Sequence, residues 1–123
     1  MYICPMYSKE LLRGTFKTII LKLLAEHGKM YGYEITQKIK EMSDDKITIT
    51  EGSLYPLLHK LEQDGILITE TMQIGKRKRR YYRLTESGNG LAQQMVAEFQ
   101  DFMKTMKVIL DNGNVAGDGL AYG

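Results

Sequence analysis

Apolar residues recur every three or four positions through the first part of the chain, which is the spacing of one face of an α-helix. The first such stripe lies in residues 15–27 and stops before Gly28, a residue that typically ends a helix. It consists of Phe16, Ile19, Ile20, Leu23 and Leu24. Leu11 and Leu12 predict one earlier turn, with Gly14 as a weak point between the turn and the helix.

A second helix is expected after a short connection at residues 29–31. Ile35, Ile39 and Met42 repeat at helical spacing up to residue 43, and two helices joined so closely form a helical corner. Residues 47–50 then alternate apolar and β-branched polar side chains, which predicts one short strand.

The third stripe lies in residues 50–65, where leucines repeat at i, i+3, i+4 and i+7 while polar and aromatic groups occupy the other faces. The leucines are Leu54, Leu57, Leu58 and Leu61. Pro56 falls inside this pattern, where its ring removes a donor and crowds the preceding turn. Two interpretations stay open: the helix begins late, with Ser53 as its N-cap, or it bends at Pro56. Gly65 closes it.

A β-hairpin with a basic turn is predicted next. Residues 66–74 are rich in β-branched side chains, with Ile66, Ile68 and Met72 on one side, and residues 80–84 form the returning strand after a turn at 75–78. Because neighbouring strand residues face opposite sides, one of the two adjacent residues Tyr81 and Tyr82 should lie in the core and the other on the surface.

A long amphipathic helix is predicted for residues 85–112. The glycine-rich residues 113–123 are predicted to form a disordered tail. About 25 helical residues extend about 37 Å, which is more than a domain of this size covers. The apolar face could pack on its own domain, but its length indicates that much of it meets a second chain. The predicted dimerisation residues are Leu91, Met95, Phe99, Phe102, Met103, Met106, Ile109 and Leu110.

Charge is distributed unevenly along the 123 residues. The net charge is +2, but residues 76–83 carry six cations and no acid, so the rest of the chain carries −4. A basic run of this kind can be solubilising or can favour a membrane surface. Its position between two predicted strands, directly after the paired helices, favours contact with phosphate groups.

Several functional classes receive little support from the residue types present. Cys4 is the only cysteine, which excludes an internal disulfide and suits a protein of a reducing compartment. It lies before the first regular hydrophobic pattern. Because that pattern begins just after Met6, Met6 is an alternative to Met1 as the first residue of the protein. His27 and His59 fall in different helices, and no catalytic or metal-ligand spacing links them, so no enzyme activity, metal or cofactor is expected. No apolar run reaches the roughly 18 residues of a membrane span, and a cytoplasmic protein is expected.

The order of helix, helix, short strand, helix, strand, basic turn and strand predicts a winged helix-turn-helix. The fold class is mainly α with a small β-hairpin, and the expected organisation is a DNA-binding domain at residues 8–84 followed by a dimerisation helix at 85–112. In such a domain the third helix enters the major groove while cations of the hairpin meet phosphates.

The sequence also resembles the PadR family of bacterial transcriptional regulators. The resemblance rests on LLRGT, ILKLLAEHG, MYGYEI, EGSLYPLLHKLEQDG and RRYYRLTESG, which occur in family order over about residues 10–90. A single long C-terminal helix is similar to the short subfamily. This resemblance implies a homodimer that binds double-stranded DNA at a palindromic operator, usually as a repressor released by a small aromatic or drug-like effector at the dimer interface. The chain has no tryptophan, unlike members that stack a ligand on one, so whether an effector is used stays open.

The exposed face of the third helix, the start of the second helix and the hairpin cations form the predicted site. Its residues are Tyr31, Tyr33, Ser53, Tyr55, His59, Lys60, Lys76, Arg77, Lys78, Arg79 and Arg80. Without the resemblance, a solvated helix face would be the favoured reading of residues 53–60. A winged-helix module that binds an acidic protein, with no specific DNA binding, is the alternative function.

Overall fold

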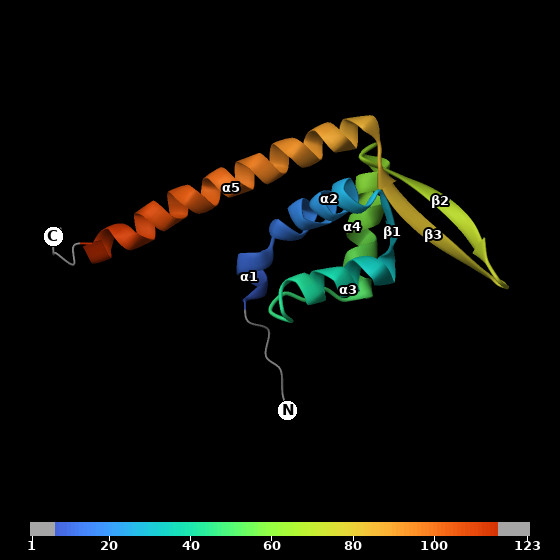
Figure 1. Ribbon diagram of the computed structural model, residues 1–123, viewed down its shortest axis with the longest axis horizontal. Coiled ribbons are helices and arrows are strands. Elements are labelled where there is room, and N and C mark those ends of the chain that lie inside the picture. The colour runs from blue at the N-terminus through green and yellow to red at the C-terminus, as the bar shows by residue number, and fades with distance from the viewer. Residues whose placement is uncertain (1–6, 116–123) are drawn as a thin grey trace, which may run out of the picture. The chain divides into compact units, whose positions relative to one another are not determined.

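The computed structural model describes residues 7–115 of the chain, with the side chains described through residue 112 (Figure 1). The chain divides into two compact units, Met1–Gln93 and Gln94–Gly123. The first unit holds four helices, a three-stranded sheet and the start of a fifth helix, and the second holds the rest of that helix.

The helices that hydrophobic spacing predicts in the first unit are all present. Their bounds are Lys9–Leu12 for α1, Thr15–His27 for α2, Gly32–Met42 for α3 and Glu51–Gln63 for α4. Gly14 and Gly28 flank α2 with φ of 87° and 86°, values that an L side chain adopts only with strain. The glycine positions therefore fix where α2 begins and ends.

The core forms where the apolar stripes of α2, α3 and α4 meet the sheet. Leu54, Leu58 and Leu61 of α4 are each at most 1% exposed. Ile35 and Ile39 of α3 are also buried, but Met42, which continues the same spacing, is exposed at the end of the helix. Burying each such aliphatic side chain contributes about 1.5–3 kcal/mol, and this packing determines which faces of the helices remain free.

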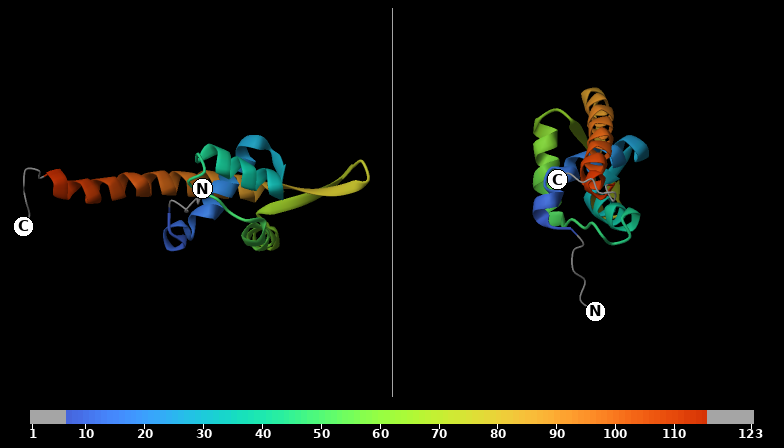
Figure 2. Two further views of the ribbon diagram at one scale, coloured as in Figure 1. Left: turned by 90° about the horizontal axis from the view of Figure 1, so that it is seen from below. Right: turned by 90° about the vertical axis from the view of Figure 1, so that its left-hand side faces the viewer.

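The sheet has three antiparallel strands in the order β1-β3-β2. Their bounds are Lys29–Tyr31 for β1, Leu67–Ile74 for β2 and Arg77–Leu84 for β3. β1 was predicted only as a connection, and it becomes a strand because Met30 pairs with Tyr82 of β3. The β2–β3 hairpin extends away from the helices in two views (Figures 1 and 2). It is the wing of the fold.

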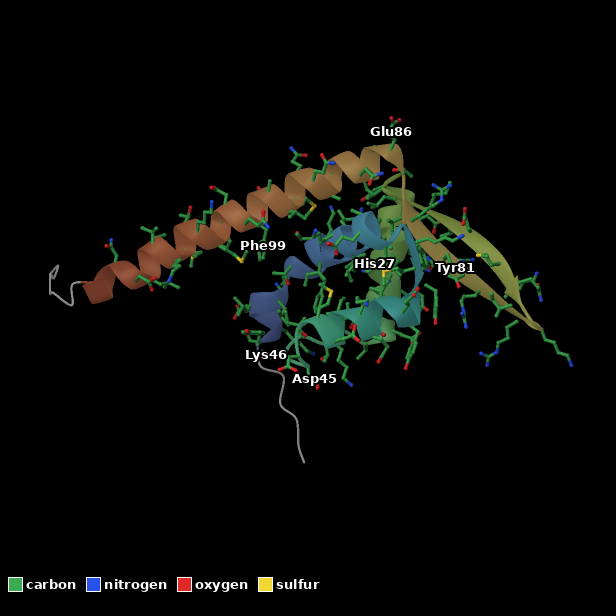
Figure 3. The ribbon with its side chains drawn as sticks, in the orientation of Figure 1. His27, Asp45, Lys46, Tyr81, Glu86 and Phe99 are labelled. Atoms are coloured by element: carbon green, nitrogen blue, oxygen red, sulfur yellow. The ribbon has the colours of Figure 1, made fainter. Side chains whose placement is uncertain are left out.

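The short strand predicted for residues 47–50 is wrong. No strand pairs with this segment in the described part of the chain, and Ser43 Oγ instead holds it by accepting from the Ile47 amide at 3.0 Å. Asp44 and Asp45 precede it with φ of 57° and 68°, and Figure 3 shows Asp45 and Lys46 in this turn. β-Branched residues form a strand only where a partner strand is available.

The start of α4 differs from the predicted late start at Ser53, whereas a bend at Pro56 stays a prediction. Thr50 rather than Ser53 is the N-cap, because the Thr50 hydroxyl accepts from the Ser53 amide at 3.2 Å. Pro56 therefore lies in the second turn of the helix, beyond the first turn where proline is best tolerated. Asp64 and Gly65 end the helix as predicted, with φ of 77° at Gly65.

The hairpin agrees with its predicted position, and Ile68 and Met72 share one face of its first strand as predicted, although this face is the exposed one. Leu67 of β2 is buried, whereas Ile68 and Met72 are 43% and 38% exposed on the opposite face. In β3, Tyr82 is buried and Tyr81 is partly exposed, which confirms the predicted alternation. The register places the turn at residues 75–76, so most of the basic run belongs to the strand.

The last helix, α5, covers Glu86–Val115 and confirms the predicted long helix. Thr85 caps it by accepting from the Gly88 amide at 3.0 Å, and a side chain at Gly88 would overlap the Ile66 carbonyl. The helix continues through residues 113–115, which were predicted as the start of a disordered tail, because a glycine costs a helix only about 1 kcal/mol. The remaining residues of that predicted tail lie outside the described part.

Candidate nucleic-acid interface

The first turn of α4 presents polar side chains to solvent. Glu51 and Ser53 are exposed, while Leu54 and Leu58 bury the opposite face of the helix. Ser53 is held locally, since its hydroxyl accepts from Thr50 Oγ1 at 3.2 Å. This end of α4 therefore offers a short row of hydrogen-bonding groups on a helix fixed by the core.

Tyr55 is fixed between the starts of α3 and α4. Its phenol ring packs so closely on Gly32 that a Cβ there would come within 2.6 Å of the ring carbon bearing the hydroxyl. The Tyr55 hydroxyl donates to Oε1 of Glu51 at 3.3 Å. Burial raises the pKa of this hydroxyl, and the Glu51 carboxylate raises it further. Tyr55 therefore stays protonated and acts as a hydrogen-bond donor.

The cations of the wing lie on both faces of β3. Arg77 and Arg79 share the solvent-facing side with Tyr81, whereas Lys78 and Arg80 lie on the side of buried Tyr82, beyond the edge of the core. Apart from partly buried Arg79, these cations are exposed. None of the four pairs with an acid among the described side chains, so their charges are available to a partner.

Tyr31 ties the wing to the first turn of α3. Its ring meets the Tyr81 ring edge-on at 5.4 Å between centroids, and the Arg79 guanidinium lies 4.1 Å from its centroid. Lys29 lies 5.5 Å from the centre of the Tyr81 ring, which Figure 3 labels on β3. Glu34 accepts from the Tyr31 amide at 3.3 Å. These contacts hold Arg79 against an aromatic face.

An ion-pair network crosses the outer face of the sheet. Glu70 of β2 accepts from Lys29 Nζ of β1 at 3.1 Å and from Arg83 Nε of β3 at 3.4 Å. The hydrogen bond from Lys29 is the main cause that holds the pKa of the Glu70 carboxyl below its ordinary value, with Arg83 adding to it. All three strands are thus linked through one carboxylate.

A shallow hollow of about 350 Å³ lies where α3, α4 and β3 meet. No acid contributes to its lining, so it favours an anion over a cation. Its lining residues are Tyr31, Gly32, Tyr55, His59, Lys78, Arg79, Arg80 and Tyr82. Six of the predicted site residues therefore come together from three separate elements.

The other predicted site residues lie outside this hollow. Tyr33 is 53% exposed on α3 and borders a separate concavity of about 480 Å³ that contains three acids and two lysines. Lys60 pairs with Asp64 at 3.6 Å in the last turn of α4. Lys76 occupies the turn of the wing, next to Gly75 with φ of 62°. The DNA-binding roles of all these residues stay predictions.

Sequence reasoning missed three residues that shape the site. Gly32 allows Tyr55 to approach α3, and Glu51 accepts a hydrogen bond from the Tyr55 hydroxyl. Buried Tyr82 forms part of the wall of the hollow. The spacing of Glu51 and Tyr55 at i and i+4 on one helix was a signal available in the sequence. The approach of Gly32 to Tyr55 joins two helices, and no local pattern indicates it.

The second unit carries a row of apolar side chains on α5. Phe102 and Met103 are 53% and 50% exposed, and Ile109 and Leu110 are 59% and 66% exposed. Phe99 and Phe102 contact each other with centroids 6.2 Å apart. Leu91, Met95, Phe99 and Met106 are partly exposed. Together with Leu91, which precedes the second unit on the same helix, this row contains every residue predicted for dimerisation, and that role stays a prediction.

Metal-binding clusters and membrane-spanning helices are both absent from residues 7–115. No group of three or more histidine, cysteine, aspartate or glutamate side chains in this range could hold a metal ion. None of its helices combines the length and the apolar character that crossing a membrane requires.

Comparison with known proteins identifies the fold and the family. Residues 20–94 match the model of the transcriptional regulator PadR-like family. A transcriptional regulator from Clostridium thermocellum superposes with a TM-score of 0.73 at 34% identity, covering 82% of this chain and 95% of its own. A PadR family regulator from Eggerthella lenta gives 0.68 at 33% identity, covering 82% and 86%. The winged-helix prediction is therefore confirmed.

Two curated relatives agree with this match. Transcriptional regulator Rv3488 of Mycobacterium tuberculosis is 30% identical over 111 residues, which are 90% of this chain and 98% of the relative. Negative transcriptional regulator PadR of Bacillus subtilis is 33% identical over 92 residues, which are 74% of this chain but half of that longer protein. The chain belongs to the PadR-like family, a family of transcriptional regulators rather than of enzymes.

Proposed function

We propose that this protein is a sequence-specific transcriptional repressor that binds a palindromic DNA operator as a homodimer. One observation carries the proposal: Tyr55 and His59 of α4 line the same acid-free hollow as three unpaired cations of β3, which are Lys78, Arg79 and Arg80. A helix that reads bases and a basic ribbon that meets the adjacent backbone must lie on one side of the molecule to bind one duplex.

In this proposal the first turn of α4 enters the major groove. Recognition helices contact base edges with their N-terminal residues, and in α4 these residues are exposed while the buried leucines fix the helix. Ser53 and Tyr55 lie in this part of α4, and His59 follows Tyr55 by one turn. Lys60, on the last turn, would leave its ion pair with Asp64 to meet a flanking phosphate.

The wing supplies contacts that do not depend on sequence. Lys76, Arg77, Lys78 and Arg80 are exposed and lack acidic partners among the described side chains, so binding a phosphate breaks no ion pair. Arg79 meets the same backbone from its position on Tyr31. The hydroxyls of Tyr31 and Tyr33 would donate to neighbouring phosphates.

The apolar row of α5 would pair two chains. Four of its large side chains, Phe102, Met103, Ile109 and Leu110, are half exposed or more, and an apolar helix face of this length is a liability in a monomer. A two-fold dimer would place the two α4 helices about one DNA turn apart, roughly 34 Å, which explains a palindromic operator.

Repression, and its release by a small molecule, complete the proposed function. Repression is supported by the name of the Bacillus subtilis relative, a negative transcriptional regulator. Met95, Met103 and Met106 give the apolar row of α5 adaptable side chains, which suit a small aromatic effector between subunits. Binding of such an effector would release the operator by favouring another arrangement of the dimer.

The test is the salt dependence of binding to the duplex upstream of the protein's own gene, measured by fluorescence anisotropy. Each lost phosphate contact lowers the slope of log K against log salt by about 0.9, so Arg77→Ala with Arg80→Ala, which removes two contacts from each chain of the dimer, should lower it by about 4. Lys22→Ala, which removes an ion-paired cation from α2, should leave it unchanged.

An unchanged slope in the double variant would refute the role of the wing. Equal affinity for the upstream duplex and for random duplex would instead favour a winged-helix module that binds an acidic protein partner.

A further inference from the structure

Glu51 is the first residue of α4, and its carboxylate is exposed at the turn that the proposed function places in the major groove. We propose that Glu51 reads a cytosine in each operator half-site and that Tyr55 positions the Glu51 carboxylate for this contact. This inference rests on the proposed function and adds which base is read and by which group.

The carboxylate of Glu51 is held rather than free to rotate. Tyr55 donates its hydroxyl to Oε1 of Glu51 at 3.3 Å, one helical turn away. The Tyr55 ring is itself fixed, because it fills the space above Gly32 where any side chain would overlap it. A chain of contacts thus runs from the first turn of α3 to one oxygen of Glu51, and no hydrogen bond from the described side chains or backbone of residues 7–112 reaches the other oxygen.

No cation neutralises Glu51 within the described part of the chain. The lysines and arginines that form ion pairs in the described part of the chain pair with acids other than Glu51. The three cations that line the hollow beside Tyr55 form no ion pair with Glu51 either. An ionised carboxylate accepts hydrogen bonds and donates none. Near a duplex it is repelled by phosphates, so it gains free energy only where a base offers a donor.

Among the four bases, cytosine best meets this requirement for a hydrogen-bond donor in the major groove. In the major groove guanine presents two acceptors and thymine an acceptor and a methyl group, so both disfavour a carboxylate. Adenine offers its N6 donor beside the N7 acceptor, whereas cytosine offers the N4 donor without an adjacent acceptor. Glu51 therefore contributes more to specificity than to affinity, because it penalises the other three bases.

An acid in the first turn of a helix also has a purely structural role, since it interacts favourably with the helix dipole. That role predicts a change in stability and none in base preference. The bases that the protein selects therefore distinguish base reading by Glu51 from a purely structural role.

The experiment is repeated selection from a pool of duplexes with a randomised central segment, followed by sequencing. The proteins are the full chain, Glu51→Gln, Tyr55→Phe and the control Glu10→Gln. Glu10→Gln removes a first-turn carboxylate from α1 and changes the net charge equally. The unaltered chain and the control should enrich a cytosine at one symmetric position of each half-site. Glu51→Gln should lose it and accept adenine, because a carboxamide pairs with N6 and N7 of that base.

The affinity for the selected duplex, measured with and without the cytosine, gives the size of the base preference. Replacing the cytosine by thymine in both half-sites should weaken the unaltered chain by about tenfold and Glu51→Gln by no more than about twofold. Tyr55→Phe keeps the ring on Gly32 and loses only the donor, so its cytosine preference should fall between the two.

Each outcome separates the proposals. If Glu51→Gln enriches the same bases as the unaltered chain at every position, the reading by Glu51 is wrong while the proposed function stands. If Tyr55→Phe keeps the full preference, Tyr55 has no positioning role. If the unaltered chain enriches no sequence at all, the proposed function itself fails.

Discussion

At the scale of single residues, Gly32 controls how closely α4 approaches α3. An alanine Cβ would lie 2.6 Å from Cζ of Tyr55 and would force the ring or the helix to move. We expect Gly32→Ala to lower the free energy of unfolding by about 1–3 kcal/mol, measured by urea denaturation. The loss should shrink when Tyr55→Ala is also present, because the overlap is then absent.

Gly52→Ala is the matched control for this prediction. The nearest atom to its added Cβ is Thr50 Oγ1 at 3.9 Å, and alanine is the better helix former, so stability should rise by up to about 1 kcal/mol. Equal losses in the two variants would contradict the assigned role of the Tyr55 ring.

The Glu70 network predicts a pH dependence at the same scale. The pKa of Glu70 in the folded protein lies below its ordinary value of 4.5 because Lys29 and Arg83 stabilise the carboxylate. The unfolded chain therefore binds the proton more readily, so the stabilisation is present above pH 4.5 and is lost as the pH falls through the lowered pKa. Glu70→Gln should lower the melting temperature at pH 7, and the difference should narrow below pH 4.5. A difference that stays constant with pH would exclude the network as its cause.

At the scale of elements, the cap of α4 is the sharpest test of how the helix starts. Thr50 accepts from the Ser53 amide, whereas Ser53 lies inside the helix and caps nothing there. We expect Thr50→Ala to cost about 1 kcal/mol in chemical denaturation and Ser53→Ala only a few tenths. A larger loss of stability for Ser53→Ala than for Thr50→Ala would instead support Ser53 as the N-cap, the start that the sequence suggested.

Local sequence predicted the elements whose signal is local and missed those that depend on a distant partner. The leucines of α4 and the glycine stops of α2 act within one helix, so spacing alone located them. β1 is a strand only because β3 lies beside it, and residues 47–50 have similar strand character but lack a partner among the described strands. The contact between Arg79 and Tyr31 depends on the same long-range pairing.

The candidate site was predicted in composition but not in arrangement. The cations and tyrosines were identified because charge runs and family motifs are visible in the sequence. Which face of β3 each cation occupies follows from the strand register, and the predicted turn at 75–78 differs from the observed turn at 75–76.

At the scale of the whole molecule, the apolar row of α5 predicts the oligomeric state. We expect the full chain to sediment at twice its mass of 14.1 kDa and Phe102→Glu with Ile109→Glu at the mass of one chain, because a buried unpaired carboxylate is costly at an interface. Analytical ultracentrifugation measures both. Ala97→Glu, on another face of the same helix, should leave the dimer intact, and dissociation by that control would show that charge alone is responsible.

The strand order has a consequence for the time course of folding. The β2–β3 hairpin joins neighbours along the chain and can close early, but β1 reaches β3 only after α3, α4 and β2 have been brought together. The pairing of β1 places Tyr31 beneath Arg79, so the surface proposed to bind DNA is completed in the last step. A partly folded chain would carry the cations of the wing without the ordered surface around them. In pulsed hydrogen exchange, the amide protons of β1 should be the last of the sheet to gain protection.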